Sequence, residues 1–229
     1  MSKKVVKKTK VKLFNLLILL IVFAGLFFSG KYIVDQPIRN IVVTGTSYLN
    51  DDYIIDLAKI RNYPPFLLFN SSSACKRITK SQYISSCKIK KKLGYVLEVN
   101  VKENKPLFYN MNNNKYVFDS GEETTEDEIS NTFRTPRLLN YVPDKKYKRF
   151  IKGMSKIKPD ILEKISDIEF QPNEYDKDRF LLYMDDGNMV YLTLTKFKTI
   201  NQYNNVLSQL EDHKGILYLD SGNHFKIME

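Results

Sequence analysis

The side chains in this sequence that could take part in catalysis are few. His213 and His224 are the two histidines among 229 residues. The motifs of zinc hydrolases, serine hydrolases and dinucleotide-binding proteins (H-E-x-x-H, G-x-S-x-G and G-x-G-x-x-G) do not occur. Glu211 and Asp212 precede His213, which would suit a weak metal site, but a surface histidine at a helix end is the ordinary interpretation. The histidines therefore indicate no catalytic or metal centre.

Paired carboxylates occur at Glu122–Glu123 and Asp185–Asp186. Such pairs can act as acid–base catalysts or as calcium ligands. Both are expected in turns, with too few neighbouring oxygens for the roughly six to eight ligands of a calcium site, so solvated loops are the better interpretation. The serines at Ser71–Ser73 lack a base at a recognisable spacing. We therefore expect a protein that is not an enzyme, with no catalytic residue, no cofactor and no metal.

Cys75 and Cys87 are the two cysteines, and two interpretations of them remain open. A disulfide would close a loop of about a dozen residues and stabilise the fold by roughly 3 kcal/mol in the chain-entropy model, provided that this region lies outside the cytoplasm. The alternative is two free, partly buried thiols that behave as small hydrophobic side chains. The sequence does not fix the distance between the two Cα atoms, on which the choice depends.

The N-terminus indicates where these residues lie in the cell. The run LFNLLILLIVFAGLFFSG, Leu13 to Gly30, contains no charge, and its extension to Ile33 is long enough for a helix across a hydrocarbon core about 30 Å thick. The alternative is a cleavable signal peptide. Its apolar core would be shorter, and Phe28 stands where a cleavage site after Gly30 needs a small residue. We therefore predict an uncleaved transmembrane anchor at residues 13–33.

The distribution of charge predicts the orientation of this anchor. Met1–Lys12 holds six lysines and no acidic residue, more than half of the net charge of +10. The positive-inside rule then places residues 1–12 in the cytoplasm and the bulk of the chain outside, as a single-pass type II protein. A basic tail can also bind nucleic acid, but residues 105–229 carry slightly more acidic than basic side chains. We expect no nucleic-acid partner.

In the first region after the anchor, the residue pattern predicts the order strand, helix, helix, strand, strand. A β-branched strand at Ile41–Gly45 precedes a helix that Asn50 would cap. The proline-containing loop 62–70 is expected to point Phe66, Leu67, Leu68 and Phe69 inward. Ser71–Ser73 would then cap a second helix that runs towards Tyr83 and Ile84. Two strands follow across a turn at Gly94, the second with Leu97, Val99 and Val101 on one buried face.

In the second exported region, the residue pattern predicts a mixed β-sheet with flanking helices. Expected strands lie at 107–109, 116–118, 168–171, 179–184 and 189–194, with a hairpin turn at Asp185–Asn188. Expected helices lie at 145–154, 161–165 and 199–210, and the acidic segment Glu122–Glu128 is expected to be a solvated loop. The last strand is expected at His224–Ile227.

Taken in order, these features resemble a known family. The stretch Ile38–Pro106, which contains IRNIVVTGTSYLNDDYI and VLEVNVKENKP, resembles a POTRA domain. With the basic tail, the anchor, the segment Lys115–Gly121 and the last strands at Gly215–Ile227, nearly the whole chain resembles FtsQ/DivIB, a family of bacterial cell-division proteins. The family closes its POTRA domain with an acidic–basic pair and a proline. Glu103 and Pro106 fit, but Asn104-Lys105 stands where the pattern has one arginine.

The resemblance implies a fold and a domain plan. The fold is a single-pass membrane protein with an exported α+β POTRA domain (β-α-α-β-β), followed by a mixed β-sheet domain with flanking helices. The domains are a basic cytoplasmic tail at 1–12, the anchor at 13–33, the POTRA-like domain at 36–104 and the β-domain at 105–229.

The resemblance also implies a function. Members are non-enzymatic divisome scaffolds that bind small single-pass division proteins of the FtsL and DivIC/FtsB kinds and help to regulate the septal peptidoglycan synthase. The implied location is the cell membrane at the division septum. The family uses the C-terminal region for its partner, and an uncovered strand edge would offer unpaired backbone groups there. The predicted partner-binding residues are Leu217, Tyr218, Asp220, Phe225 and Ile227.

Other interpretations stay open. His224–Ile227 could simply end the sheet, its edge guarded by Lys226. The chain could instead be an exported POTRA-type chaperone or translocation module, although no barrel-like series of strands follows. It could also bind the cell wall, because Lys88–Lys92 would give a basic strand for an anionic polymer.

Overall fold

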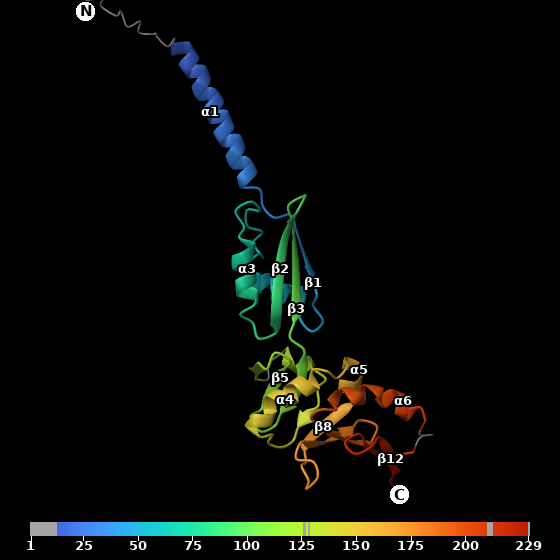
Figure 1. Ribbon diagram of the computed structural model, residues 1–229. Helices are drawn as coiled ribbons and strands as arrows, with labels where there is room; N and C mark the ends of the chain where they lie inside the picture. Colours follow the sequence, from blue (N-terminus) through green and yellow to red (C-terminus); the bar gives the residue numbers. More distant parts are fainter. Residues whose placement is uncertain (1–12, 126, 128, 210–212, 229) are drawn as a thin grey trace, which may run out of the picture.

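The computed structural model describes residues 13–125, 127, 129–209 and 213–228. An N-terminal helix leads into a small domain with three strands, and a larger domain with a second sheet follows at the opposite end of the molecule (Figure 1). The predicted lysine-rich tail at 1–12 lies outside the described residues.

Helix α1, Leu13–Val34, has the length and composition of a membrane span. Its 22 residues correspond to about 33 Å, slightly more than the hydrocarbon core. None of its most apolar window is buried against the rest of the protein. The hydroxyl of Ser29 donates to the carbonyl of Gly25 at 2.7 Å, which satisfies this polar group within the helix.

The first domain after α1 has the predicted β-α-α-β-β order. It contains β1 (Asn40–Thr44), α2 (Asp51–Ala58), α3 (Ser71–Ile78), β2 (Ile84–Lys92) and β3 (Val96–Glu103). Strand β3 lies in the centre of the sheet, parallel to β1 and antiparallel to β2. Leu97, Val99 and Val101 are buried against the helices, which confirms the predicted face of β3.

Two asparagines begin the helices of this domain. Asn50 accepts the N–H of Tyr53 at 2.8 Å, as predicted, and Asn70 accepts the N–H of Ser73 at 2.9 Å. The prediction that Ser71–Ser73 caps α3 is wrong by one residue. Asn70 has the extended backbone of an N-cap, whereas the three serines are already helical.

Two further predictions for this domain are wrong. Helix α3 ends at Ile78 instead of running to Tyr83. In the loop before it only Phe66 is buried, Phe69 is half-buried, and Leu67 and Leu68 are exposed. The loop packs the Phe66 ring into the core and the Phe69 ring against it, and it turns the two leucines outwards.

Among the described residues, the second domain is built on a nine-stranded mixed sheet with the order β12-β11-β10-β9-β8-β7-β4-β5-β6. The strands are β4 (Pro106–Asn110), β5 (Lys115–Phe118), β6 (Glu123–Thr124), β7 (Arg137–Leu138), β8 (Ile165–Phe170), β9 (Arg179–Met184), β10 (Met189–Thr193), β11 (Gly215–Tyr218) and β12 (His224–Ile227). The helices are α4 (Asp144–Met154), α5 (Pro159–Leu162) and α6 (Tyr203–Leu207), with 3-10 turns η1 (Ser130–Thr132) and η2 (Phe197–Gln202). The core of this domain includes a stack of Phe150 on Phe180, whose ring centroids lie 4.8 Å apart.

Some helix and loop predictions for this domain need correction. The helix expected at 161–165 ends at Leu162, and Ile165 begins β8. The helix expected at 199–210 consists of η2 followed by the short α6, and Leu210 lies outside the described residues. The acidic segment expected to be a solvated loop contains β6, and its Thr124 is buried.

Cys75 of α3 and Cys87 of β2 form a disulfide, with 5.3 Å between their Cα atoms. The bond joins a helix to the sheet beneath it. We expect the double substitution Cys75→Ala and Cys87→Ala to lower the free energy of unfolding by about 3 kcal/mol, because the reduced unfolded chain gains loop entropy. Chemical denaturation of the oxidised wild type and of the variant measures this. Equal stability in the absence of reductant would show that the thiols are free in the native protein.

Candidate partner-binding edge

Strand β12 lies at one end of the large sheet, where it pairs only with β11 among the described residues. In Figure 1 it lies at the end of the molecule opposite α1. The prediction of a strand at His224–Ile227 is confirmed in its bounds. A strand in this position has one row of backbone groups without a partner in the sheet.

The hydrogen-bond pattern identifies those groups. The N–H of Met228 donates to the carbonyl of Lys214 at 2.9 Å. Antiparallel ladders bond through alternate residues, so Lys226 and His224 also face β11. Phe225 and Ile227 then direct their N–H and C=O groups away from the sheet.

The predicted apolar contact residues do not all lie on the surface. Leu217 is 3% exposed and belongs to the core of the domain. Phe225, opposite it in β12, is partly buried against the same core, whereas Ile227 is 52% exposed. A Cβ on Gly215 would lie 2.7 Å from the Phe225 ring and 2.2 Å from the carbonyl oxygen of Lys226, so this close approach of β12 requires glycine. Because the Leu217 side chain is buried, it cannot contact a partner directly. It can affect binding only by positioning the edge strand.

The opposite face of the sheet carries a row of stacked side chains. The ring of Tyr218 lies between those of Tyr191 and His224, with centroid distances of 5.3 and 4.6 Å. The guanidinium carbon of Arg179 lies 3.4 Å from the centroid of Tyr191. This row crosses β9, β10, β11 and β12 and fixes the edge strand to the interior of the sheet.

Asp220, also predicted to contact a partner, is occupied within the fold. Its carboxylate pairs with Arg179 Nε at 2.7 Å, and both side chains are largely buried. Its carbonyl accepts a hydrogen bond from Lys196 Nζ at 3.2 Å. Asp220 thus holds the turn between β11 and β12 against the sheet instead of offering a free charge at the edge.

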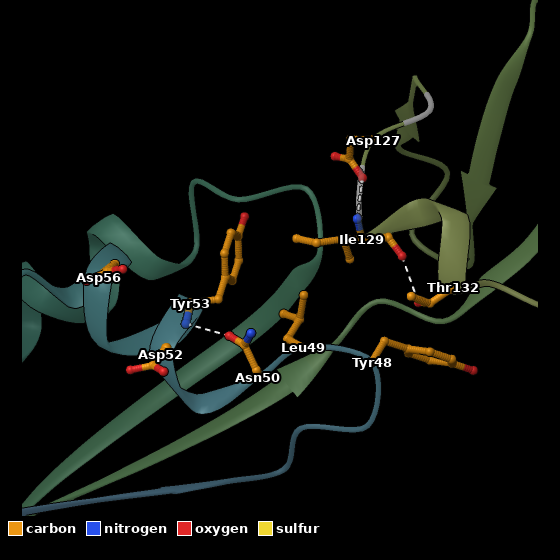
Figure 2. Close-up of a pocket in the computed structure, with 9 residues that line it drawn as sticks. All are labelled: Tyr48, Leu49, Asn50, Asp52, Tyr53, Asp56, Asp127, Ile129 and Thr132. Atoms are coloured by element: carbon orange, nitrogen blue, oxygen red, sulfur yellow. Dashed lines mark hydrogen bonds between the residues drawn. The ribbon is translucent and has the colours of Figure 1, made fainter.

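A cavity that the sequence did not suggest lies between the first and second domains. Its volume is about 700 Å³. Figure 2 shows the residues that line it, from the start of α2 and from the segment around η1. Its carboxylates already have partners. Asp56 binds Arg61 at 2.6 Å, and Asp127 accepts a hydrogen bond from the hydroxyl of Tyr83.

Among the described residues, no group of three or more His, Cys, Asp and Glu side chains is placed to hold a metal ion. Glu211 and Asp212, which precede His213, lie outside these residues.

The boundary between the domains is tied by the Glu103–Pro106 segment and by shared aromatic packing. Glu103 accepts the backbone N–H groups of Ser47, Tyr48 and Leu49 at 2.9–3.0 Å. Lys105 Nζ donates to the carbonyl of Ile157, deep in the second domain. Phe118 of β5 belongs to the core of the first domain, where its ring packs edge-on against Tyr83. The first domain therefore shares its core with the second.

Asp127 gives this junction a dependence on pH. Burial raises the pKa of Tyr83 to about 12, assisted by the Asp127 carboxylate. Burial opposes ionisation of Asp127, but hydrogen bonds from Tyr83, Ser130 and Ile129 outweigh it and lower the pKa of Asp127. A carboxyl group with a lowered native pKa stabilises the fold above its unfolded pKa of about 3.9 and loses this effect as the pH falls through the native pKa.

We therefore expect Asp127→Asn to lower the melting temperature at pH 7, and the difference from wild type to shrink below about pH 4. Thermal melts of the full chain in detergent across this range measure it. A difference that persists unchanged to pH 2 would show that the carboxylate is not responsible.

Two family models and several relatives match this chain. The family model "POTRA domain, FtsQ-type" matches residues 36–104, and "Cell division protein FtsQ/DivIB, C-terminal" matches residues 101–221. The cell division protein DivIB of Bacillus subtilis (strain 168) is 27% identical over 218 residues, which are 90% of this chain and 82% of that protein. DivIB of Brevibacillus brevis is 28% identical over 221 residues, 90% of this chain and 78% of that protein. A solved structure, the major extracytoplasmic domain of DivIB from Geobacillus stearothermophilus, aligns with a TM-score of 0.38 and 18% identity over 48% of this chain and 96% of that one.

Proposed function

Because this chain belongs to the FtsQ/DivIB family of bacterial cell-division proteins, we propose that it is a non-enzymatic scaffold of the division machinery. In this role it binds small single-pass division proteins of the FtsL and DivIC/FtsB kinds and helps to regulate septal peptidoglycan synthesis. The observation that carries the proposal is the open edge of β12, with the backbone groups of Phe225 and Ile227 directed away from the sheet.

The chemistry of this edge fits one kind of partner. A segment in extended conformation can add to β12 through main-chain hydrogen bonds, which provide affinity without a deep pocket. Ile227 adds an exposed apolar side chain beside them, and the row from Arg179 to His224 keeps the strand in place before binding. A pre-ordered edge loses little conformational freedom when a partner binds, which favours affinity.

Co-purification tests the proposal. The tagged chain is isolated from detergent-solubilised membranes of dividing cells, together with a version truncated after Ser221 that lacks β12. We expect the full chain to retain the single-pass division proteins and the truncated chain to lose them. Capture of cell-wall fragments without division proteins would support wall binding instead. Equal capture by both versions would place the interface away from β12.

The proposal includes a type II topology, with residues 1–12 in the cytoplasm, the two domains outside and the protein concentrated at the septum. It is supported by the apolar helix α1 and by the six lysines before it. We expect protease added to intact, wall-stripped cells to digest the exported domains and leave a small membrane-bound stub. N-terminal sequencing of the untreated protein provides the control. A mature N-terminus near Gly30 would mean that α1 is removed as a signal peptide.

A further inference from the structure

The end of the first exported domain that adjoins α1 exposes apolar side chains. Leu67 and Leu68 lie in the loop between α2 and α3, and Leu93 lies in the turn between β2 and β3. Leu68 is 67% exposed and Leu93 is 99% exposed. Figure 1 shows both loops at the end of the domain that carries α1. We call Leu67, Leu68 and Leu93 the membrane-proximal rim.

The two parts of the rim are held together. Lys91 Nζ donates to the carbonyl of Leu67 at 3.0 Å and lies 5.4 Å from the centroid of the Phe66 ring. The Phe66 ring packs edge-on against Tyr95, which follows the β2–β3 turn. The exposed leucines therefore project from an ordered surface.

The rim is also tied to the residues that leave α1. The N–H of Phe66 donates to the carbonyl of Gln36 at 2.9 Å, and the N–H of Ile38 donates to the carbonyl of Pro64 at 3.1 Å. Ile38 is already part of the domain core. Only four residue steps separate it from Val34, the last residue of α1, which limits their separation to about 14 Å. If α1 crosses the membrane, this end of the domain must lie at the bilayer surface.

Exposed basic side chains flank the two loops of the rim. Lys59 ends α2 before the Leu67–Leu68 loop, and Lys90, Lys91 and Lys92 end β2 just before Leu93. The guanidinium carbon of Arg39 lies 5.0 Å from the centroid of Tyr95, which follows the β2–β3 turn. The acidic side chains nearby are fewer, and most are paired. Glu98 binds Lys92 at 3.0 Å and Asp56 binds Arg61, which leaves Asp35. Exposed leucines flanked by more basic than acidic side chains complement the interface of an anionic membrane.

We propose that the membrane-proximal rim docks on the outer surface of the bilayer that holds α1, with Leu68 and Leu93 entering the interfacial region and Lys90 near anionic phospholipid headgroups. This contact goes beyond partner binding at β12 and does not depend on it. It would hold the first domain in a fixed orientation relative to the membrane and so reinforce the connection through residues 35–37.

The chain contains no tryptophan, so a single introduced indole reports on its own position. The full chain with Leu68→Trp or Leu93→Trp is reconstituted into vesicles of phosphatidylcholine and phosphatidylglycerol that contain lipids brominated on the acyl chain. Tyr175→Trp is the matched control, since Tyr175 is 96% exposed in the loop between β8 and β9 of the second domain. We expect both rim indoles to be quenched at least about twofold more strongly than the control, because indole partitions into the membrane interface.

The contribution of charge is tested in the Leu93→Trp chain. Lys90→Glu should reduce the quenching, whereas Lys88→Glu, on the same face of β2 but farther from the turn, should not. Flotation of every variant with the vesicles shows separately that α1 has inserted. Rim indoles quenched no more than the control in chains that float would overturn the proposal. A blue shift without quenching would overturn it as well, by indicating contact with a second copy of the protein. Equal effects of the two lysine substitutions would overturn the role assigned to Lys90.

Discussion

Val99→Asp should unfold the first domain under conditions in which the wild type is stable. Val99 is fully buried on the core face of β3, the central strand of the domain. A carboxylate there would have no cation or hydrogen-bond donor provided for it, and we expect the free energy of unfolding to fall by about 4–5 kcal/mol. That is a large fraction of the total stability of a domain of this size. Denaturant unfolding of the full chain in detergent, followed by circular dichroism, measures the loss.

Asn100→Asp is the matched control, because it places the same carboxylate one residue along the strand. Asn100 is exposed on the opposite face, and its side-chain amide donates to the hydroxyl of Thr44 at 2.9 Å. The Thr44 hydroxyl can donate to an aspartate instead, so we expect a change within about 0.5 kcal/mol. Similar losses for the two variants would show that the faces of β3 are assigned incorrectly.

Ile227→Pro should weaken binding of a partner strand at β12 at least about thirtyfold, or about 2 kcal/mol. Proline removes one outward N–H from the open edge, and its ring occupies space where an added strand would lie. The melting temperature should change little, because the N–H of Ile227 is not used in the ladder with β11. Titration of the purified chain with the partner identified by co-purification measures the affinity.

Lys226→Ala is the control for this substitution. Lys226 lies at the same edge and has an exposed side chain, but its N–H faces β11, so the outward backbone groups remain intact. We expect near wild-type affinity. If Ile227→Pro instead melts the domain, the assignment of outward and inward amides is wrong. If it leaves both affinity and stability unchanged, the partner binds elsewhere.

The elements that could be predicted from the sequence are those specified by local chemistry. The alternation at Leu97, Val99 and Val101 identified the buried face of β3, and Asn50 identified the start of α2. The turn residues at Asp185–Asn188 identified the hairpin of β9 and β10. The order of such signals also identified the family, which the matches to residues 36–104 and 101–221 confirm.

The short strands, the burial of loop side chains and the pairing at the sheet edge could not be predicted, because they depend on contacts between residues distant in the sequence. Strands β6 and β7 have two residues each and exist because β5, β4 and β8 provide partners for them. Leu67 and Leu68 were expected inside because they are apolar, but the composition of a loop does not reveal whether the core has room for it. At the candidate edge, the sequence indicated the strand, but the burial of Leu217 and the pairing of Asp220 with Arg179 depend on the register of the sheet.

Phe118, a residue of the second domain that packs in the core of the first, couples the two domains. With a shared core, the two domains behave as one spacer, and β12 stands beyond the full length of β3 from the membrane end (Figure 1). The eight residues of β3 alone span about 26 Å. To cover that length, the stalk of a partner anchored in the same bilayer would need about 17 residues if it were helical, or about 8 if it were extended. If β12 is the partner edge, a single-pass protein with a shorter stalk could not reach it.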